Sequence, residues 1–397
     1  MTTHLPVPSR AATTGVWPGD EPRLAASDGF DVLADAHVPV PLMSTPAEGD
    51  TRWAADLTGL AVQFLDGMPV DRTTRGWRLA RGSSPRSAAD LRVETSRFRR
   101  TLDALGEYGE GFAGRFLLTL PGPWELLHAL DLPGGNPALS DPGARRDVVQ
   151  AYAAGVLGLR AEFGRLFGRG TSGRGDEVLR LRLREDHLDA ILTGTVPTAS
   201  GLRTLPAVPD LQVAAGLRSF LARCGADPLL SLPRAGFFEI AGKRIPHGRF
   251  AAEVLPAPPD TAEMGTARSA LDETPAEASV ASGTDRPGLV VPLHTLDDHG
   301  WEQLAVLVEE GRGVWVGLPA GAGDRPGEVS HWTRSVSVPW GRIGMGTTGL
   351  RDLGVLTGWE APHRVPPVLP VAATTAAARG QAELASRVAA ALAAWEG

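Results

Sequence analysis

The feature that most constrains the fold is a repeated alternation of short apolar runs with longer amphipathic stretches. Phe116–Leu120 is a compact apolar run typical of a strand that is buried on both faces, and Pro121–Pro123 ends it. Val314–Leu318 is a second run of this kind. Between such runs, apolar residues recur at helical spacing. This alternation predicts an α/β protein with a parallel sheet.

The expected helices have start signals and apolar stripes. Ser87–Asp90 is a candidate capping box, and Asp141-Pro142 opens another helix, because proline in the first turn lacks only an N–H that has no partner there. The stripes consist of Leu91, Phe98, Leu102 and Leu105; of Val149, Tyr152, Val156, Leu159, Phe163 and Phe167; of Val213, Leu217, Phe220, Leu221 and Cys224; of Trp301, Leu304, Leu307 and Val308; and of Leu384, Val388, Leu392 and Trp395.

Two architectures accommodate this alternation, an open doubly wound sheet and a closed barrel. No GxGxxG or Walker-type phosphate loop follows any apolar run, which favours the barrel. We therefore expect a single-domain (β/α)8 TIM barrel over residues 13–397. Residues 1–12 are expected to form a flexible tail. Residues 256–288 carry six acidic residues, five prolines and no aromatic residue, which predicts a disordered acidic insertion.

The composition argues against several classes of function. Lys and Arg number 39 against 46 Asp and Glu, and the net charge of -7 argues against nucleic acid or an anionic membrane as a partner. The chain shows no secretory signal pattern and no apolar run long enough to cross a bilayer, so we expect a cytoplasmic protein. Its single cysteine, Cys224, excludes an internal disulfide and a multi-cysteine metal cage.

Six phrases, in order along the chain, resemble the cobalamin-independent methionine synthase family in its short, single-barrel actinobacterial form. They are Thr14–Gly19, Arg75–Leu79, Gly122–Leu126, Asp141–Asp147, Gly194–Gly201 and Val314–Ala320. The resemblance implies a TIM barrel in methionine biosynthesis, a methyltransferase that moves a methyl group from 5-methyltetrahydropteroyl-glutamate to homocysteine. It also implies zinc, and no cobalamin, because zinc deprotonates the homocysteine thiol.

The chain departs from this family at the zinc ligands. Ser231 and Leu232 stand where the family has histidine and cysteine, and Thr348 stands where it has a late cysteine. A hydroxyl and an aliphatic side chain do not replace an imidazole and a thiolate on zinc. The resemblance therefore implies zinc, but the sequence supplies none of the family's ligands, and the catalytic residues stay unknown. Cys224 is expected to be a small buried hydrophobe.

Three arginines share one face of an expected strand because they alternate with leucines. They are Arg180, Arg182 and Arg184. Arg184 stands where the family has the aspartate that holds the substrate amine, and of that phrase only Glu185 is retained. One interpretation is a cationic barrel mouth that binds an anionic small molecule. The other is internal ion pairing with Glu185, Asp186 or Glu177.

Two further candidates for ligand binding are His187 and Trp17. His187 follows the arginine-rich strand, where the active sites of TIM barrels lie, so it is either an acid–base group or an exposed loop histidine without a role. Trp17 is either a flat surface for a pterin-like ring or a packing residue. The nine histidines include no His-x-x-x-His helical pair.

Three functions are compatible with these observations. The first is the methyltransferase, which needs at least two nitrogen or sulfur ligands that converge at the barrel mouth. The second is a non-catalytic binding barrel, with a mouth that side chains fill. The third is a metal-free enzyme, similar to the uroporphyrinogen decarboxylase-like barrels, that acts on an anionic substrate. This enzyme needs Arg182 or Arg184 beside an unpaired carboxylate in an open pocket.

Overall fold

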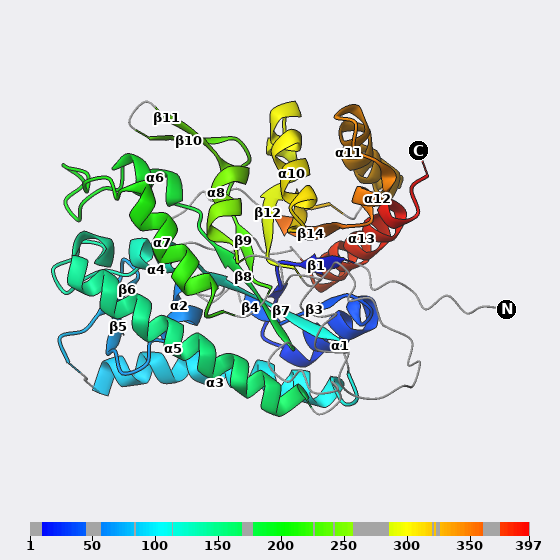
Figure 1. The fold of residues 1–397 in the computed structure, drawn as a ribbon. Coiled ribbons are helices and arrows are strands. Elements are labelled where there is room, and N and C mark those ends of the chain that lie inside the picture. The colour runs from blue at the N-terminus through cyan, green and yellow to red at the C-terminus, as the bar shows by residue number, and fades with distance from the viewer. Residues whose placement is uncertain are drawn as a thin grey trace, which may run out of the picture.

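Eight parallel strands form a nearly closed barrel surrounded by helices, as predicted (Figure 1). The computed structural model describes residues 10–44, 57–82, 85–112, 114–168, 178–224, 227–240, 243–256, 286–319, 321–322, 326–359 and 374–396. In the order in which they pair, the barrel strands are β1 (Ala11–Thr13), β14 (Leu353–Trp359), β13 (Gly313–Pro319), β12 (Gly288–Pro292), β9 (Leu229–Ser231), β8 (Leu179–Arg184), β7 (Arg115–Pro121) and β3 (His37–Pro39).

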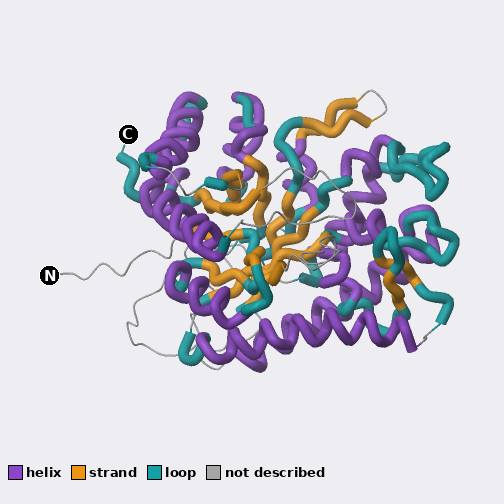
Figure 2. The backbone as a smooth tube through the Cα atoms, turned by 180° about the vertical axis from the view of Figure 1, so that it is seen from behind, coloured by secondary structure: helices purple, strands orange, loops and turns teal. Residues whose placement is uncertain are grey.

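Helices cover the outside of this barrel, and the long helices α3 and α5 run along one side of it (Figures 1 and 2). The helices are α1 (Pro22–Leu33), α2 (Leu57–Val62), α3 (Pro85–Tyr108), α4 (Pro123–Ala129), α5 (Pro142–Phe167), α6 (Leu188–Thr193), α7 (Asp210–Leu221), α8 (His247–Val254), α10 (Asp298–Glu309), α11 (Glu328–Arg342), α12 (Thr347–Leu350) and α13 (Thr375–Ala393). Short strand pairs decorate the barrel: β2 (Val16–Pro18) with β4 (Leu42–Ser44), β5 (Val70–Arg72) with β6 (Trp77–Leu79), and β10 (Phe237–Ile240) with β11 (Lys243–Pro246).

The barrel strands separate two apolar clusters, because successive side chains of a strand point to opposite faces. One face of each strand, represented by Leu118, Leu181 and Val316, packs with the helices in the large outer core. The other face forms a separate cluster inside the barrel, which consists of Ala12, Leu117, Leu229, Val290, Trp315, Leu356 and Trp359. The interior is therefore a packed core and not a pore, as in other TIM barrels.

The helix-start predictions have different outcomes. Asp141 caps α5 as expected, since its Oδ1 accepts a hydrogen bond from the backbone N–H of Ala144 at 2.7 Å. The capping box predicted at Ser87 is wrong, because α3 already begins at Pro85. Proline is favoured in the first turn of a helix, so Pro85 marks this start better than the serine does.

The flexible tail predicted over residues 1–12 is too long. Ala11–Thr13 pairs with Val355–Thr357 as a barrel strand, and Arg10, Ala11 and Ala12 are all buried. Residues 1–9 lie outside the described part of the chain. Residues 257–285 of the predicted acidic insertion also lie outside the described part of the chain. The last residue of the predicted insertion, Gly288, is the first residue of β12.

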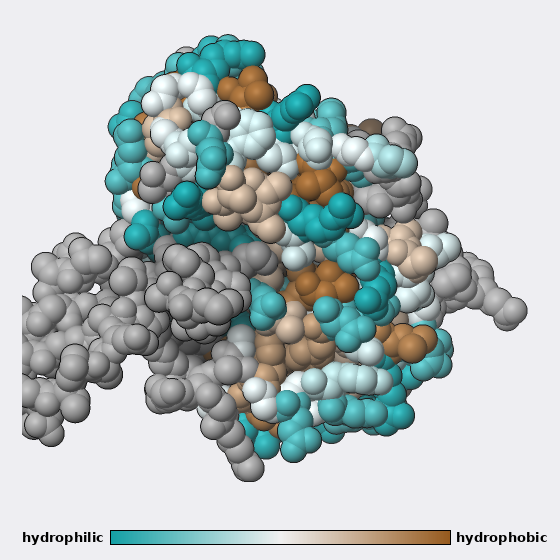
Figure 3. Space-filling view, turned by 90° about the vertical axis from the view of Figure 1, so that its right-hand side faces the viewer, coloured by the Kyte–Doolittle hydropathy of each residue, from teal (hydrophilic) through white to brown (hydrophobic). Residues whose placement is uncertain are grey.

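Among the described residues visible in Figure 3, hydrophobic patches lie between polar residues. Among the described helices, none is both long and apolar enough to span a membrane. Cys224 is buried, and this burial raises the pKa of its thiol to about 12. It packs as the small hydrophobe that the sequence predicts.

Candidate metal centre

Polar side chains gather at the carboxyl ends of the neighbouring strands β7 and β8. Strand β7 ends at Pro121 and leads through Gly122 into α4, while β8 ends at Arg184 and is followed by Glu185, Asp186 and His187. Because the two strands are parallel and paired over six positions, α4 and the segment after β8 meet at the same end of the barrel. Active sites of TIM barrels lie at this end.

Glu125, His128 and His187 converge there. Glu125 Oε1 lies 2.8 Å from His187 Nδ1, and Glu125 Oε2 accepts a hydrogen bond of 2.9 Å from the backbone N–H of His187. The rings of His128 and His187 are stacked, with centroids 4.1 Å apart and 14° between their planes. One potential ligand atom from each residue lies within 4.8 Å of the other two. Two imidazoles and one carboxylate form a donor set that catalytic zinc sites use.

Burial and mutual charge set the protonation of these groups. Burial lowers the pKa of His128 to about 4, although the charge of Glu125 opposes this, so His128 is neutral near pH 7. Its Nδ1 is buried without a hydrogen-bond partner. Burial would raise the pKa of Glu125, but the hydrogen bond and charge of His187 outweigh it and lower that pKa. Burial lowers the pKa of His187, and Glu125 more than compensates, so this pKa is raised.

Glu185 positions α4 and therefore Glu125 and His128. Its carboxylate accepts hydrogen bonds from the backbone N–H groups of Trp124 (3.0 Å) and Glu125 (2.7 Å) at the start of the helix. It is fully buried, and burial together with the charge of Glu125 raises the pKa of its carboxyl group well above the ordinary value. Gly122 is required beside it, because a Cβ at this position would collide with the Glu185 carboxylate. Glu185 thus acts on the geometry of the centre.

The arginines of β8 differ in their partners. At the amino end of the strand, Arg180 donates from Nε to the carbonyl oxygen of Asp227 at 2.9 Å and also lies near its carboxylate. At the carboxyl end, Arg184 forms an ion pair with Asp186, with Nη2 and Oδ2 2.5 Å apart. Both side chains are buried and paired internally.

Arg182, between them, forms no ion pair with any described residue. Its Nε and Nη2 donate to the hydroxyl of Ser231 at 3.2 and 3.0 Å, and its Cζ lies 4.8 Å from the ring centroid of Trp359. Its Nη1 is buried without a partner. Burial and the nearby charge of Arg184 lower the pKa of this guanidinium well below its ordinary value.

The positions where the family has zinc ligands do not fit a metal. Ser231 is fully buried and its hydroxyl already accepts two hydrogen bonds from Arg182. Leu232 is fully buried in the apolar core between strands and helices. Thr348 lies in α12, and its side chain is outside the described part of the structure. Ser231 and Leu232 are therefore not available as metal ligands in this structure.

Trp17, predicted as a candidate surface for a ring, has a packing role instead. It is 1% exposed and packs against Ala25 of α1 and Ala378 of α13. These contacts agree with the packing alternative, because two helices cover the indole, and one of them comes from the far end of the chain.

Sequence reasoning singled out His187 but missed its two companions. Glu125 and His128 are three residues apart on α4, a Glu-x-x-His spacing that places both side chains on one helix face and recurs in metal-binding bundles. This spacing was the available signal. A search for His-x-x-x-His pairs could not find the centre, because its helical pair is a glutamate and a histidine three residues apart and the third member, His187, lies in the segment after β8.

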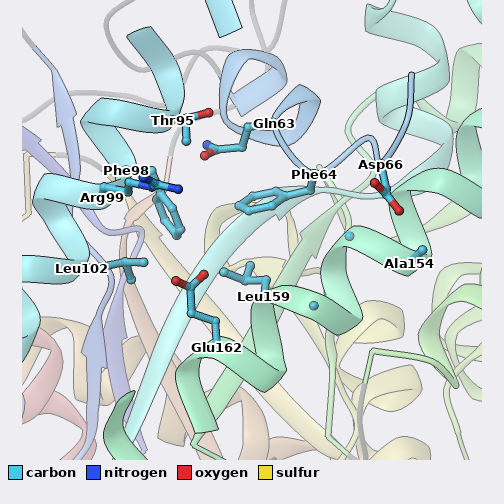
Figure 4. A pocket seen from close by; sticks show the side chains of 12 residues that line it. Gln63, Phe64, Asp66, Thr95, Phe98, Arg99, Leu102, Ala154, Leu159 and Glu162 are labelled. Atoms are coloured by element: carbon cyan, nitrogen blue, oxygen red, sulfur yellow. The ribbon is translucent and has the colours of Figure 1, made fainter. Parts of the chain in front are cut away.

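A cavity of about 370 Å³ lies elsewhere, on the outside of the barrel between α3, α5 and the segment after α2 (Figure 4). Phe64, Phe98 and Leu159 supply apolar walls, and Arg99 and Glu162 supply charged groups. Its lining includes none of the residues of the candidate metal centre.

Comparisons with known proteins find a similar solved structure but no matching family. No family model matches the chain, and a comparison with curated proteins finds no match. Among solved structures, the chain is similar to a B12-independent methionine synthase from Shewanella sp. W3-18-1 in complex with selenomethionine. The two are 12% identical, 97% of each chain is covered, and the TM-score is 0.44. These values carry no argument about the reaction, and the TIM-barrel assignment depends on this chain's own strand order.

Proposed function

We propose that the protein is a metal-dependent TIM-barrel enzyme and that Glu125, His128 and His187 bind its metal. The observation that carries this proposal is the convergence of one carboxylate and two imidazoles within 4.8 Å of one another at the carboxyl ends of β7 and β8. Three protein ligands of this kind leave a fourth position for a substrate on zinc, which is the arrangement of a catalytic site.

The donor set fits zinc in its chemistry and needs a small adjustment in its geometry. His128 is neutral and has a buried, unpartnered Nδ1, so one imidazole is available as a ligand. The 2.8 Å between Glu125 and His187 is a hydrogen-bond distance. Two ligands of a tetrahedral zinc with bonds of about 2.0–2.1 Å lie roughly 3.3 Å apart. Metal binding therefore has to release the proton in the hydrogen bond between Glu125 and His187 and to move these two side chains slightly apart.

For the reaction, we propose methyl transfer to a thiol, the class that the sequence resemblance implies. Bound zinc supplies a lowered thiol pKa, and hence a thiolate nucleophile near neutral pH. The chain's own residues hold and orient the reactants: Glu185 fixes α4 and its two ligands, and Trp359 fills the barrel interior against Arg182. Arg182, which forms no ion pair with a described residue, makes this end of the barrel attractive to an anionic substrate.

A specific observation favours a second candidate, a metal-free acid–base site. Glu125 holds Nδ1 of His187, which fixes the orientation of the ring and leaves Nε2 for proton transfer. This is the carboxylate–histidine arrangement of many general bases. In this case the metal-free enzyme acting on an anionic substrate replaces the methyltransferase.

Zinc content separates the two candidates. After loading with excess zinc and dialysis against a weak chelator, we expect about one tightly bound zinc ion per chain. The double variant His128→Ala/His187→Ala should retain none. A matched control, His294→Ala/His331→Ala, removes two histidines outside the centre and should retain the metal. If the wild-type protein retains no zinc, the metal proposal fails, and the acid–base site or the non-catalytic barrel takes its place.

The reaction has its own test. Zinc-loaded protein is incubated with homocysteine and 5-methyltetrahydropteroyl-glutamate, and methionine is quantified. We expect formation of methionine, and a loss of about 100-fold or more in His128→Ala/His187→Ala, because the metal then has one ligand left. Full zinc binding without methionine would keep the metal centre and reject this reaction.

A further inference from the structure

The charge balance beside the metal centre is incomplete. Arg182 and Arg184 both lie near the Trp359 ring, with Cζ atoms 4.8 and 6.0 Å from its centroid. Asp186 forms its ion pair with Arg184 and acts on Arg182 through its charge alone, while Arg182 contacts the Ser231 hydroxyl and the indole face. Burying a cation without a carboxylate costs several kcal/mol as an order of magnitude. Two guanidinium groups therefore share one carboxylate, and the set of Arg182, Arg184 and Asp186 has an excess of one positive charge.

The guanidinium of Arg182 extends toward the carboxyl end of the barrel. In the pairing of β8 with β9, Arg182 lies opposite Leu229, and Ser231 lies opposite Arg184. Arg182 nevertheless donates to Ser231, so its side chain reaches past its own position to the level of Arg184. Trp359, whose ring it covers, is the last residue of β14. The uncompensated charge is thus at the end of the barrel where chemistry takes place.

Two buried hydrogen-bond donors at this place have no acceptor among the residues that the structure describes. They are Nη1 of Arg182 and Nε1 of Trp359, and their side chains are 1% and 2% exposed. Unmet buried donors cost about 1–3 kcal/mol each, and more when the group is charged. Since the guanidinium lies over the indole, the two donors are neighbours.

We propose that Arg182 and Trp359 form the anchor for a carboxylate of the substrate. One carboxylate offers two oxygens, so it supplies acceptors for both donors and neutralises the guanidinium at the same time. Ser231 holds the guanidinium in place through its hydroxyl. This inference builds on the proposed function, because it assigns the substrate a carboxylate at one end and, at the other, the thiol that the metal centre activates.

The anchor is tested first on metal-free protein, with propionate and its neutral isostere propionamide in ligand-observed NMR titrations. We expect propionate to bind at least tenfold tighter than propionamide. Arg182→Met should abolish this preference, and Trp359→Phe, which keeps a ring and removes the N–H, should weaken it severalfold. Arg203→Met, which removes an exposed arginine, is the matched control and should leave it unchanged.

Arg182→Lys provides a second variant that keeps the charge and loses the planar fork, in case Arg182→Met does not fold. It should bind propionate more weakly than wild type and still prefer it to propionamide. The proposal is overturned if wild-type protein binds the two probes equally, or if a folded Arg182 variant retains the full preference.

A second experiment tests whether one ligand binds to the carboxylate anchor and to the metal at the same time. Zinc-loaded protein is titrated with 3-mercaptopropionate and with 3-mercaptopropionamide, and we expect the acid to bind at least tenfold tighter. If zinc does not bind but metal-free protein still prefers propionate, the metal proposal fails and the anchor holds. If zinc binds and the acid has no advantage over the amide, the anchor fails and the metal centre holds.

Discussion

Arg180 and Arg182 occupy the same face of one strand, two residues apart, and their surroundings differ. At the amino end of the barrel, all three guanidinium nitrogens of Arg180 have partners: the Asp227 carbonyl at 2.9 Å, the Arg286 carbonyl at 2.6 Å and His37 Nε2 at 3.4 Å. At the carboxyl end, Arg182 has a serine hydroxyl and an indole face, and one nitrogen without a partner.

The difference follows from which segments enter each end of the barrel. Asp227 lies two residues before β9, and Arg286 lies two residues before β12. Both offer a backbone carbonyl to Arg180 at the amino end, and Asp227 adds its carboxylate. Ser231, at the carboxyl end of β9, brings only a neutral hydroxyl to Arg182. In TIM barrels the amino end serves stability and the carboxyl end serves chemistry. The comparison teaches that a buried charge without an ion pair is itself a sign of the functional end.

The largest expected effect is on stability, and it tests whether Arg180 and Arg182 differ in their structural role. Arg180→Met should lower the free energy of unfolding by roughly 3 kcal/mol, because it removes the donor to the carbonyl oxygens of Asp227 and Arg286 and leaves Arg115 as the remaining cation beside the Asp227 carboxylate. Arg182→Met should change it by less than about 1 kcal/mol in either direction, since losing the bonds to Ser231 is offset by removing an uncompensated buried charge. Urea unfolding of both variants measures the difference. Equal destabilisation would show that the two arginines have the same structural role.

A second prediction concerns the support of the metal centre. Glu185→Ala leaves the buried N–H groups of Trp124 and Glu125 without an acceptor, so stability should fall by about 2 kcal/mol. Because α4 loses its anchor, zinc affinity should also fall by about 10–100-fold. Glu185→Gln keeps an acceptor, so it should lower both the stability and the zinc affinity less than Glu185→Ala does. Urea unfolding and a zinc competition assay measure the two quantities. A stability loss with unchanged zinc affinity would contradict the positioning role.

The smallest expected effect is a pH dependence at the amino end. Burial and the nearby charges of Arg180, Arg115 and Arg10 hold the pKa of His37 well below its usual value. The unfolded chain therefore binds a proton near pH 6.5 that the folded chain does not, so His37 contributes full stability above this pH. This contribution is lost as the pH falls toward the folded-state pKa.

The measurement compares wild type with His37→Gln. Between pH 6.5 and 5, unfolding free energies of wild type should decline more steeply, by up to about 1.4 kcal/mol per pH unit. Above pH 7 the two slopes should coincide. Identical slopes over the acidic range would mean that the amino end is not sensitive to proton uptake at His37.

The barrel could be predicted from the sequence because its longer strands are apolar runs, and such runs indicate burial on both faces. Phe116–Leu120 and the alternating Leu179–Arg184 segment have the patterns that their two faces require. The alternation also placed the arginines on one face. It could not decide which of them is paired, because Asp227 and Ser231 lie far along the chain and meet β8 only through strand pairing.

The candidate metal centre was less predictable for the same reason. Glu125 and His128 carry a spacing signal on α4, but nothing local links them to His187. Their meeting depends on the adjacency of β7 and β8 and on the orientation that Glu185 gives to α4. The role of Trp17 was equally non-local, since α13 from the other end of the chain covers it.

The most direct test of the central claim is an anomalous diffraction measurement at the zinc absorption edge, on crystals of the zinc-loaded protein. The account predicts one strong peak bounded by the Glu125 carboxylate and the imidazoles of His128 and His187, at bond lengths of about 2.0–2.2 Å. A map with no peak there, and with the hydrogen bond between Glu125 and His187 intact, would contradict it.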